Sequence, residues 1–141
     1  MNYARLNAAA CRVGKKYTYV FGGRNETELL ATIERYNADY NIWNLLNLLL
    51  PCAVSNLYAI PLPHNSHNIL IIGGLKEAEK SAFGSKKEQY EIQEKVFILK
   101  ESEGVWVRLR DFPYKKKVGA AVMNGQGKVF CQVFNNNAEL P

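Results

Sequence analysis

The residues whose side chains could do chemistry are few and widely spaced. His64 and His67 form a His-x-x-His pair, and Cys52 lies some distance before them. Zinc takes three or four ligands at set spacings, whereas the stretch around the histidines, with Pro61 and Pro63, is typical of a turn between strands. We interpret the pair as part of a surface loop and expect no metal site and no cofactor.

No pattern typical of a catalytic centre occurs in the 141 residues. The sequence lacks a Gly-x-Ser-x-Gly nucleophile elbow, a phosphate-binding P-loop and a His-Glu-x-x-His zinc motif. Glu26, Glu28 and Glu34 are carboxylates, but nothing in the sequence pairs them as acid and base. We therefore expect the protein not to be an enzyme.

Basic residues exceed acidic ones by 18 to 13, which gives a net charge of +5. This mild excess would help association with an acidic partner but does not by itself indicate nucleic acid. The basic run at 115–117 lies beside Phe112 and Tyr114 and could contact phosphate or an acidic tail. A solvated loop is the favoured interpretation. The aromatic residues are better explained as sheet core, so we expect no nucleic-acid binding.

Three cysteines, Cys11, Cys52 and Cys131, lie far apart among apolar neighbours. An odd number at such spacing predicts free thiols in a reducing compartment. No apolar run reaches the roughly 18 to 20 residues needed to span a bilayer, and the first residues lack the apolar core of a secretory signal. We expect a cytoplasmic protein without membrane contacts.

The elements that must position these residues form a repeat. Each unit has a short apolar run, a turn and a second apolar run, and the first two units end this pattern in Gly-Gly. A further run then leads through a polar turn to a tryptophan. Runs of this length rich in β-branched and aromatic residues predict four short strands per unit, with Trp43 and Trp106 filling the space between sheets. The paired runs are 5–14 with 17–23, 57–62 with 69–74, and 118–125 with 128–133.

Two segments allow other interpretations. Residues 26–36 carry apolar side chains at helical spacing and could form an amphipathic helix, but the matching residues 95–100 of the second unit favour a strand for 32–36. The polar stretch 76–94 is interpreted as an inserted loop. Asn124-Gly125 offers the positive φ values of a tight hairpin turn.

This order of residues resembles the Kelch repeat. The second unit keeps the Gly-Gly pair, Trp106 and Pro113, but has an apolar run in place of Tyr-Asn. The third unit stops after two strands and has Phe134-Asn135 in place of Gly-Gly. The first unit carries the whole pattern, namely Arg5, Gly22-Gly23, Tyr36-Asn37, Trp43 and Pro51.

The resemblance implies an all-β fold made of four-stranded antiparallel blades of a Kelch-like β-propeller. The expected blades are 1–51, 52–113 with the insertion 76–94, and a partial third blade over 114–141. A closed propeller needs about four to eight blades. The chain is therefore expected to form an incomplete ring of about two and a half blades, which a homo-oligomer or additional blades would close.

The resemblance also implies a protein-binding surface made of the loop after Gly-Gly and the loop before the innermost strand. Arginine suits such a surface because its planar fork holds carboxylates, which favours an acidic partner. The alternative is that Arg5 and Arg24 cap turns or solvate a rim. The expected partner-binding residues are Arg5, Asn7, Arg24, Asn25, Ser55, Asn56, Lys76, Lys116 and Lys117.

Three functions remain open at this point. The first is a protein-interaction scaffold or substrate-binding module, of the kind used in ubiquitination or cytoskeletal attachment. The second is a fragment of a propeller enzyme, of the copper oxidase or sugar epimerase type, for which two histidines on one loop do not supply a copper site. The third is a structural component of a large cytoskeletal assembly.

Overall fold

The computed structural model describes residues 1–63, 67–78, 89–113 and 117–134. Every regular element in these ranges is a β-strand, which confirms the predicted all-β fold. The strands are β1 (Ala9–Val13), β2 (Tyr17–Phe21), β3 (Thr32–Asn37), β4 (Ile42–Leu49), β5 (Tyr58–Pro61), β6 (Asn68–Ile72), β7 (Leu75–Glu77), β8 (Tyr90–Ile92), β9 (Phe97–Lys100), β10 (Val105–Arg108), β11 (Lys117–Met123) and β12 (Val129–Phe134).

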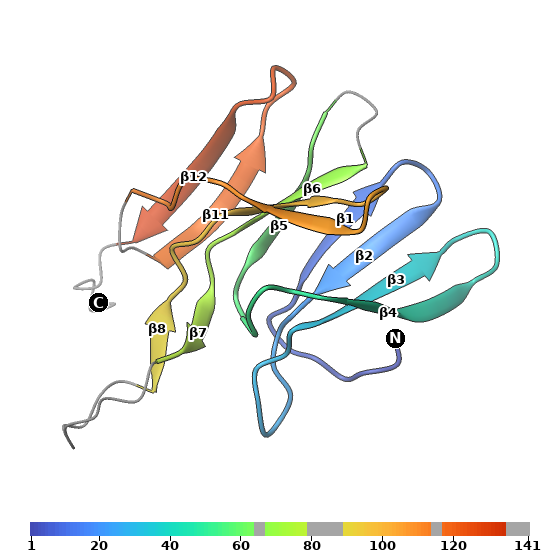
Figure 1. Ribbon diagram of the computed structural model, residues 1–141, viewed down its shortest axis with the longest axis horizontal. Coiled ribbons are helices and arrows are strands. Elements are labelled where there is room, and N and C mark those ends of the chain that lie inside the picture. Colours follow the sequence, from blue (N-terminus) through green and yellow to red (C-terminus); the bar gives the residue numbers. More distant parts are fainter. Residues whose placement is uncertain (64–66, 79–88, 114–116, 135–141) are drawn as a thin grey trace.

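Ten of the described strands form three stacked antiparallel sheets, one for each repeat, and β7 and β8 form a separate two-stranded sheet (Figure 1). The first sheet has the order β1-β2-β3-β4, and the second has the equivalent order β5-β6-β9-β10. The third sheet consists of β11 and β12. Residues 32–36 lie in β3, so the strand favoured by the repeat is confirmed over the helix.

The interpretation of 76–94 as a loop is wrong at its two ends. Leu75–Glu77 pairs with Tyr90–Ile92 as the two-stranded ladder β7–β8, with Leu75 opposite Ile92. The backbone N–H of Gln93 donates to the carbonyl of Gly74 at 3.0 Å and closes the base of this ladder. Apolar residues at the two ends of a charge-rich stretch direct the pairing, and the charged composition concealed them.

The predicted hairpin at Asn124-Gly125 has a different geometry from the tight turn expected there. The positive φ value, 78°, is at Gly127 rather than at either predicted residue. Asn124 Oδ1 accepts hydrogen bonds from the N–H groups of Gln126 and Lys128 at 3.0 and 2.9 Å. Asn124 therefore stabilises a longer turn with its side chain, and Gly127, three residues later, takes the left-handed position.

One hydrophobic core lies between the first and second sheets. Side chains alternate across a strand, and Cys11, Tyr19 and Ile33 of the first sheet face Ile69 and Leu99 of the second sheet in one buried cluster. A second core, between the second and third sheets, includes the buried residues Ile60, Leu70, Ile72 and Val96.

The two tryptophans differ in position. Trp106 packs against the first core, and its Nε1 donates to the carbonyl of Leu49 across the two sheets at 2.8 Å, which confirms its predicted role. Trp43 lies on the other face of the first sheet against Tyr36, with ring centroids 5.1 Å apart. The prediction that Trp43 fills the space between sheets is wrong for the sheets of this chain.

The stacked sheets do not close into a ring (Figure 1). The first strands of the three sheets lie next to one another, because β5 contacts both β1 and β11. The segments that lead into β1 and β5, residues 6–8 and 55–57, therefore meet at one end of the stack.

Among the described residues, no helix combines the length and the apolar character that crossing a membrane requires.

Candidate protein-binding face

The loop before the first strand and the loop after Gly-Gly are joined in both complete units. In the first unit, Leu6 and Arg24 exchange two backbone hydrogen bonds of 2.8 and 2.9 Å. In the second unit, Ser55 and Leu75 make the equivalent pair at 3.0 and 2.8 Å. The two predicted loop types therefore form a single surface, which we call the loop face (residues 6–8, 24–25, 55–57 and 75–76).

Backbone hydrogen bonds also connect the loop face across the two units. The N–H of Asn56 donates to the carbonyl of Asn7 at 2.8 Å, and the N–H of Gly23 donates to the carbonyl of Val54 at 2.9 Å. The second glycine of each Gly-Gly pair permits the close pairing of the two loops within its own unit: a Cβ on Gly23 would lie 2.6 Å from the Leu6 carbonyl oxygen, and a Cβ on Gly74 would lie 2.7 Å from the Ser55 carbonyl oxygen. Only glycine fits at such distances.

Asn7 and Asn56 have the same position and conformation in the two units. Each lies two residues before the first residue of the first strand of its sheet and has a φ of 54°, in the left-handed region. Asparagine is one of the few residues with a side chain that adopts this conformation readily. The sequence carries this signal as two asparagines at one position of the repeat, 49 residues apart.

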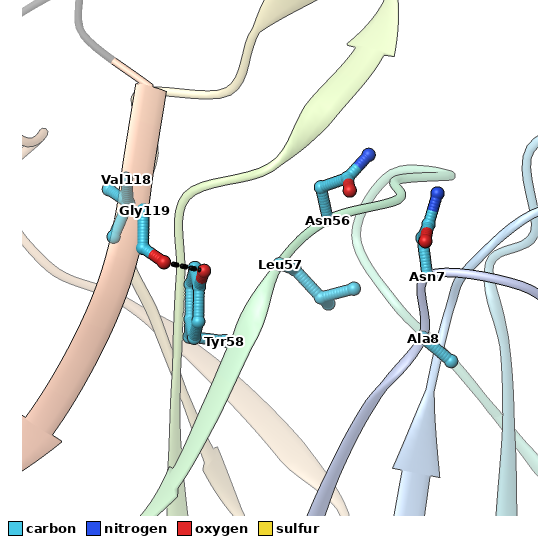
Figure 2. A pocket seen from close by; sticks show the side chains of 7 residues that line it. All are labelled: Asn7, Ala8, Asn56, Leu57, Tyr58, Val118 and Gly119. Atoms are coloured by element: carbon cyan, nitrogen blue, oxygen red, sulfur yellow. Dashed lines mark hydrogen bonds between the residues drawn. The ribbon is translucent and has the colours of Figure 1, made fainter. Parts of the chain in front are cut away.

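A pocket of about 340 Å³ opens on the loop face where the three first strands begin. Figure 2 shows the carboxamide groups of Asn7 and Asn56 at its mouth, side by side and pointing the same way. Carboxamides both donate and accept hydrogen bonds, so this mouth can bind a peptide group, an amide or a carboxylate. The pocket is lined by Asn7, Ala8, Asn56, Leu57, Tyr58, Val118 and Gly119.

Tyr58 fixes the wall between the second and third sheets. Its hydroxyl group donates to the carbonyl of Gly119 (Figure 2). Leu57 and Val118 are 4% and 2% exposed and make this side of the pocket apolar. The pocket thus combines a polar mouth with an apolar floor.

Arg24 and Asn25 lie on the loop face as predicted, but part of their bonding capacity is used locally. Arg24 is half-buried, and its Nε contacts the Asn25 carbonyl at 3.5 Å. Asn25 Oδ1 accepts from the N–H groups of Thr27 and Glu28 at 2.9 and 2.8 Å. Asn25 therefore shapes the loop, and Arg24 is the cationic side chain of this loop.

Arg5, one of the predicted partner contacts, is buried and is not presented on the loop face. Its side chain is 1% exposed and forms an ion pair of 3.2 Å with Glu34, whose side chain is fully buried. It also donates to the carbonyls of Gly22 and Thr32 at 2.8 and 3.1 Å. Arg5 therefore donates hydrogen bonds to backbone carbonyls at the ends of β2 and β3 and to a buried carboxylate. This agrees with the alternative in which Arg5 caps turns.

Ser55 and Lys76 are also less available than predicted. Ser55 is 3% exposed, and its hydroxyl contacts Asn56 Nδ2 at 3.3 Å. Lys76 lies in β7, where its Nζ pairs with Glu91 at 2.6 Å. Lys116 lies outside the described residues, and Lys117 begins β11 but its side chain is not among those described.

The described residues contain no group of three or more histidine, cysteine or acidic side chains placed to hold a metal. His67 Nδ1 lies 3.5 Å from Glu101, and His64 is outside the described residues. All three cysteines are free. Burial raises the pKa of the Cys11 thiol to about 12, which leaves it protonated and unreactive near neutral pH.

The fold and this face define an all-β protein of stacked four-stranded antiparallel sheets with its shared loops at one end. Residues 4–47 match the model of the Kelch motif. The match covers β1, β2, β3 and most of β4, so the predicted resemblance is confirmed on the first unit, which carries a Kelch motif.

Proposed function

We propose that the protein is a protein-interaction module whose loop face binds an extended segment of a partner. The Kelch motif supports an interaction module rather than an enzyme. The observation that carries the proposal is the pocket with two carboxamides at its mouth, formed jointly by neighbouring repeats. A surface built by two repeats exists only in the folded stack, as expected of a recognition site.

The proposed partner segment is acidic. Arg24 is the guanidinium that the loop face presents, and the whole chain carries a net charge of +5. A carboxylate or amide side chain entering the pocket would accept hydrogen bonds from Asn7 and Asn56, while the apolar floor would contact its methylene groups. This proposal assigns the protein no catalytic step and no cofactor, and its free thiols favour the cytoplasm.

The test is a selection of displayed random peptides on the full chain. Asn7→Gly and Asn56→Gly remove both carboxamides and keep the positive φ, because glycine adopts this conformation freely. We expect the peptides enriched on the native protein to be rich in Asp and Glu. They should bind the double variant at least about tenfold more weakly, because the variant lacks one or two hydrogen bonds to the peptide.

The matched control is Lys16→Ala, which removes an exposed cation paired with Asp39 near the turn between β1 and β2. It should leave peptide binding unchanged. Equal binding to the native protein and to the double glycine variant would contradict the assignment of the pocket.

The exposed face of the third sheet supports a second proposal, that further sheets complete a closed propeller. Counterpart residues form one cross-strand pair in each sheet: Cys11–Tyr19, Ile60–Leu70 and Val122–Phe130. Side chains of the first two pairs are at most 7% exposed, whereas Val122 and Phe130 are 62% and 56% exposed. An apolar face of this kind is stable when another sheet covers it.

The cover would come from a second copy or from additional blades. Light scattering separates the cases for this chain, because closure by self-association predicts a mass that is a multiple of 16.0 kDa. A soluble monomer whose size does not depend on salt or concentration would contradict closure by self-association. Stoichiometric copper in the purified protein would instead support a propeller enzyme.

A further inference from the structure

The turn between β11 and β12 contains the two groups of an intramolecular reaction. Residues 124–125 are the only Asn-Gly pair in the 141 residues. The carboxamide carbon of an asparagine can be attacked by the backbone nitrogen of the next residue when the two groups are held together. A glycine in that next position has no Cβ to obstruct the attack. The turn is not part of the loop face, so this chemistry is independent of the proposed binding function.

The carboxamide of Asn124 is held against the backbone that follows it. Its Oδ1 accepts hydrogen bonds from the N–H groups of Gln126 and Lys128 at 3.0 and 2.9 Å. The backbone carbonyl of Asn124 accepts from the N–H of Gly127 at 3.0 Å, which fixes the turn around this side chain. Two N–H donors on one carbonyl oxygen stabilise the negative charge that the oxygen gains when a nucleophile attacks its carbon. The turn therefore activates the carboxamide on the side of the chain where the next backbone nitrogen lies.

Gly125 leaves this attack unobstructed, although the backbone of the turn does not require a glycine there. The residue is exposed, so water has access to it. Its φ is not positive, and a Cβ built on it would meet no atom within 4 Å. An alanine would therefore fit the turn and would place a methyl group beside the attacking nitrogen. This makes Gly125→Ala a substitution that affects the reaction with little strain in the fold.

An asparagine in the first unit has a similar set of donors without the glycine. Asn25 Oδ1 accepts from the N–H groups of Thr27 and Glu28 at 2.9 and 2.8 Å. The residue after it is Glu26, which has a Cβ and a negatively charged side chain. Its carboxylate also disfavours the loss of a proton from the neighbouring amide. Asn25 is thus an internal control for the contribution of the glycine.

We propose that Asn124 is a site of spontaneous deamidation in the folded protein. The nitrogen of Gly125 gives its proton to a solvent base and forms a bond to Cγ of Asn124, and the carboxamide nitrogen leaves as ammonia after taking a proton from water. The resulting cyclic imide takes up water, which breaks one of the two C–N bonds of the ring. The products are aspartate or isoaspartate at position 124 and ammonia. Nothing is oxidised or reduced, and water is the co-reactant.

The reaction changes the connection at the end of the third sheet. In the isoaspartate product the backbone runs through Cγ, which adds a methylene group between β11 and β12, and the former backbone carbonyl becomes a free carboxylate. This carbonyl accepts from Gly127 before the reaction. Gly127 lies beside the second unit, because a Cβ on it would be 3.5 Å from Cγ of Pro63. The terminal pair of the ladder, Met123–Val129, should therefore loosen together with the contact to Pro63.

The test is incubation of the full native chain in mildly alkaline buffer, followed by digestion and mass spectrometry that separates asparagine, aspartate and isoaspartate. We expect conversion at Asn124 to be at least about tenfold faster than at Asn25, since the lower barrier requires the glycine. Gly125→Ala should slow conversion at Asn124 by at least about tenfold. Urea unfolding of this variant checks that the fold is retained. Amide spectra of the native chain after conversion should change at Met123, Gly127 and Val129.

Equal rates of conversion at Asn124 and Asn25 in the folded chain would overturn the proposal. Conversion at Asn124 that occurs only when the chain is unfolded in urea would also overturn it, because the native turn would then protect the carboxamide. An unchanged rate in a folded Gly125→Ala variant would contradict the role of the unobstructed nitrogen and would overturn it as well.

Discussion

The first and second units have the same four-stranded order but different chemistry at one pair of positions. The first unit has Arg5 and Glu34, joined at 3.2 Å in a buried ion pair. At the equivalent positions the second unit has Val54 and Phe97, which are 2% and 9% exposed. One architecture therefore accepts either a satisfied ion pair or two apolar side chains.

The four-stranded fold therefore does not require an ion pair at these two positions. Replacing a buried ion pair with apolar residues of suitable shape is often neutral, whereas removing one partner leaves a buried charge. Arg5 has additional bonds to the Gly22 and Thr32 carbonyls, which tie the chain entering β1 to the ends of β2 and β3. The second unit makes the same strand order without these side-chain bonds.

The largest expected effect comes from Glu34→Ala. It leaves the Arg5 guanidinium buried without a carboxylate and should lower the free energy of unfolding by about 3–5 kcal/mol. Urea unfolding monitored by circular dichroism measures this loss. The double variant Arg5→Val with Glu34→Phe, which copies the second unit, should recover most of it.

The exposed pair Lys16–Asp39 is the matched control, with side chains 40% and 59% exposed. Asp39→Ala should cost less than about 1 kcal/mol. If Glu34→Ala lowered the free energy of unfolding as little as Asp39→Ala does, the buried Arg5–Glu34 pair would not stabilise the first unit more than an exposed pair, which would contradict this account.

The second-largest expected loss of stability comes from replacing the second glycine of the Gly-Gly pair in either unit. Gly23→Ala and Gly74→Ala each place a Cβ against a backbone carbonyl and should cost more than about 2 kcal/mol, as an alanine at positive φ with a steric clash. Gly14→Ala is the control, because it also has a positive φ but nothing lies within 4 Å of its Cβ. It should cost about 1 kcal/mol. Thermal unfolding of the three variants tests this order.

A smaller effect separates the two tryptophans. Trp106→Phe removes the hydrogen bond to the Leu49 carbonyl between the sheets and should cost about 1 kcal/mol or slightly more. Trp43→Phe keeps an aromatic ring against Tyr36 and should cost less. Equal losses in urea unfolding would mean that Trp106 does not link the two units.

The smallest effect concerns the buried thiol of the first sheet. Because burial raises the pKa of Cys11 from 9.0 to about 12, the unfolded chain loses this proton at a lower pH than the folded chain. The contribution of Cys11 to stability should therefore fall as pH rises above about 9. Cys11→Ala should have a flatter dependence of unfolding on pH in this range. Native Cys11 should also resist thiol reagents at pH 8, and rapid labelling of the folded protein would contradict its burial.

The strands of the three stacked sheets were predictable from the sequence because their apolar patterns repeat, whereas β7 and β8, which have no counterpart in the first unit, were not. The strand at 32–36 could be distinguished from a helix only through its counterpart in the second unit. The position of Arg5 could not be predicted, because its carboxylate partner is 29 residues away and the resemblance suggested a binding role. Asn7 and Asn56 were found through the repeat, but their shared backbone conformation and the pocket between them required the paired sheets.

Amide hydrogen exchange at Asn56 tests most directly whether neighbouring repeats build one loop face. Its N–H donates to the Asn7 carbonyl in the other unit at 2.8 Å. The account predicts that this amide exchanges slowly, together with Gly23, which bonds to Val54 across the same junction. Exchange at Asn56 and Gly23 as fast as in an unstructured peptide would contradict a shared face and leave the two units as separate surfaces.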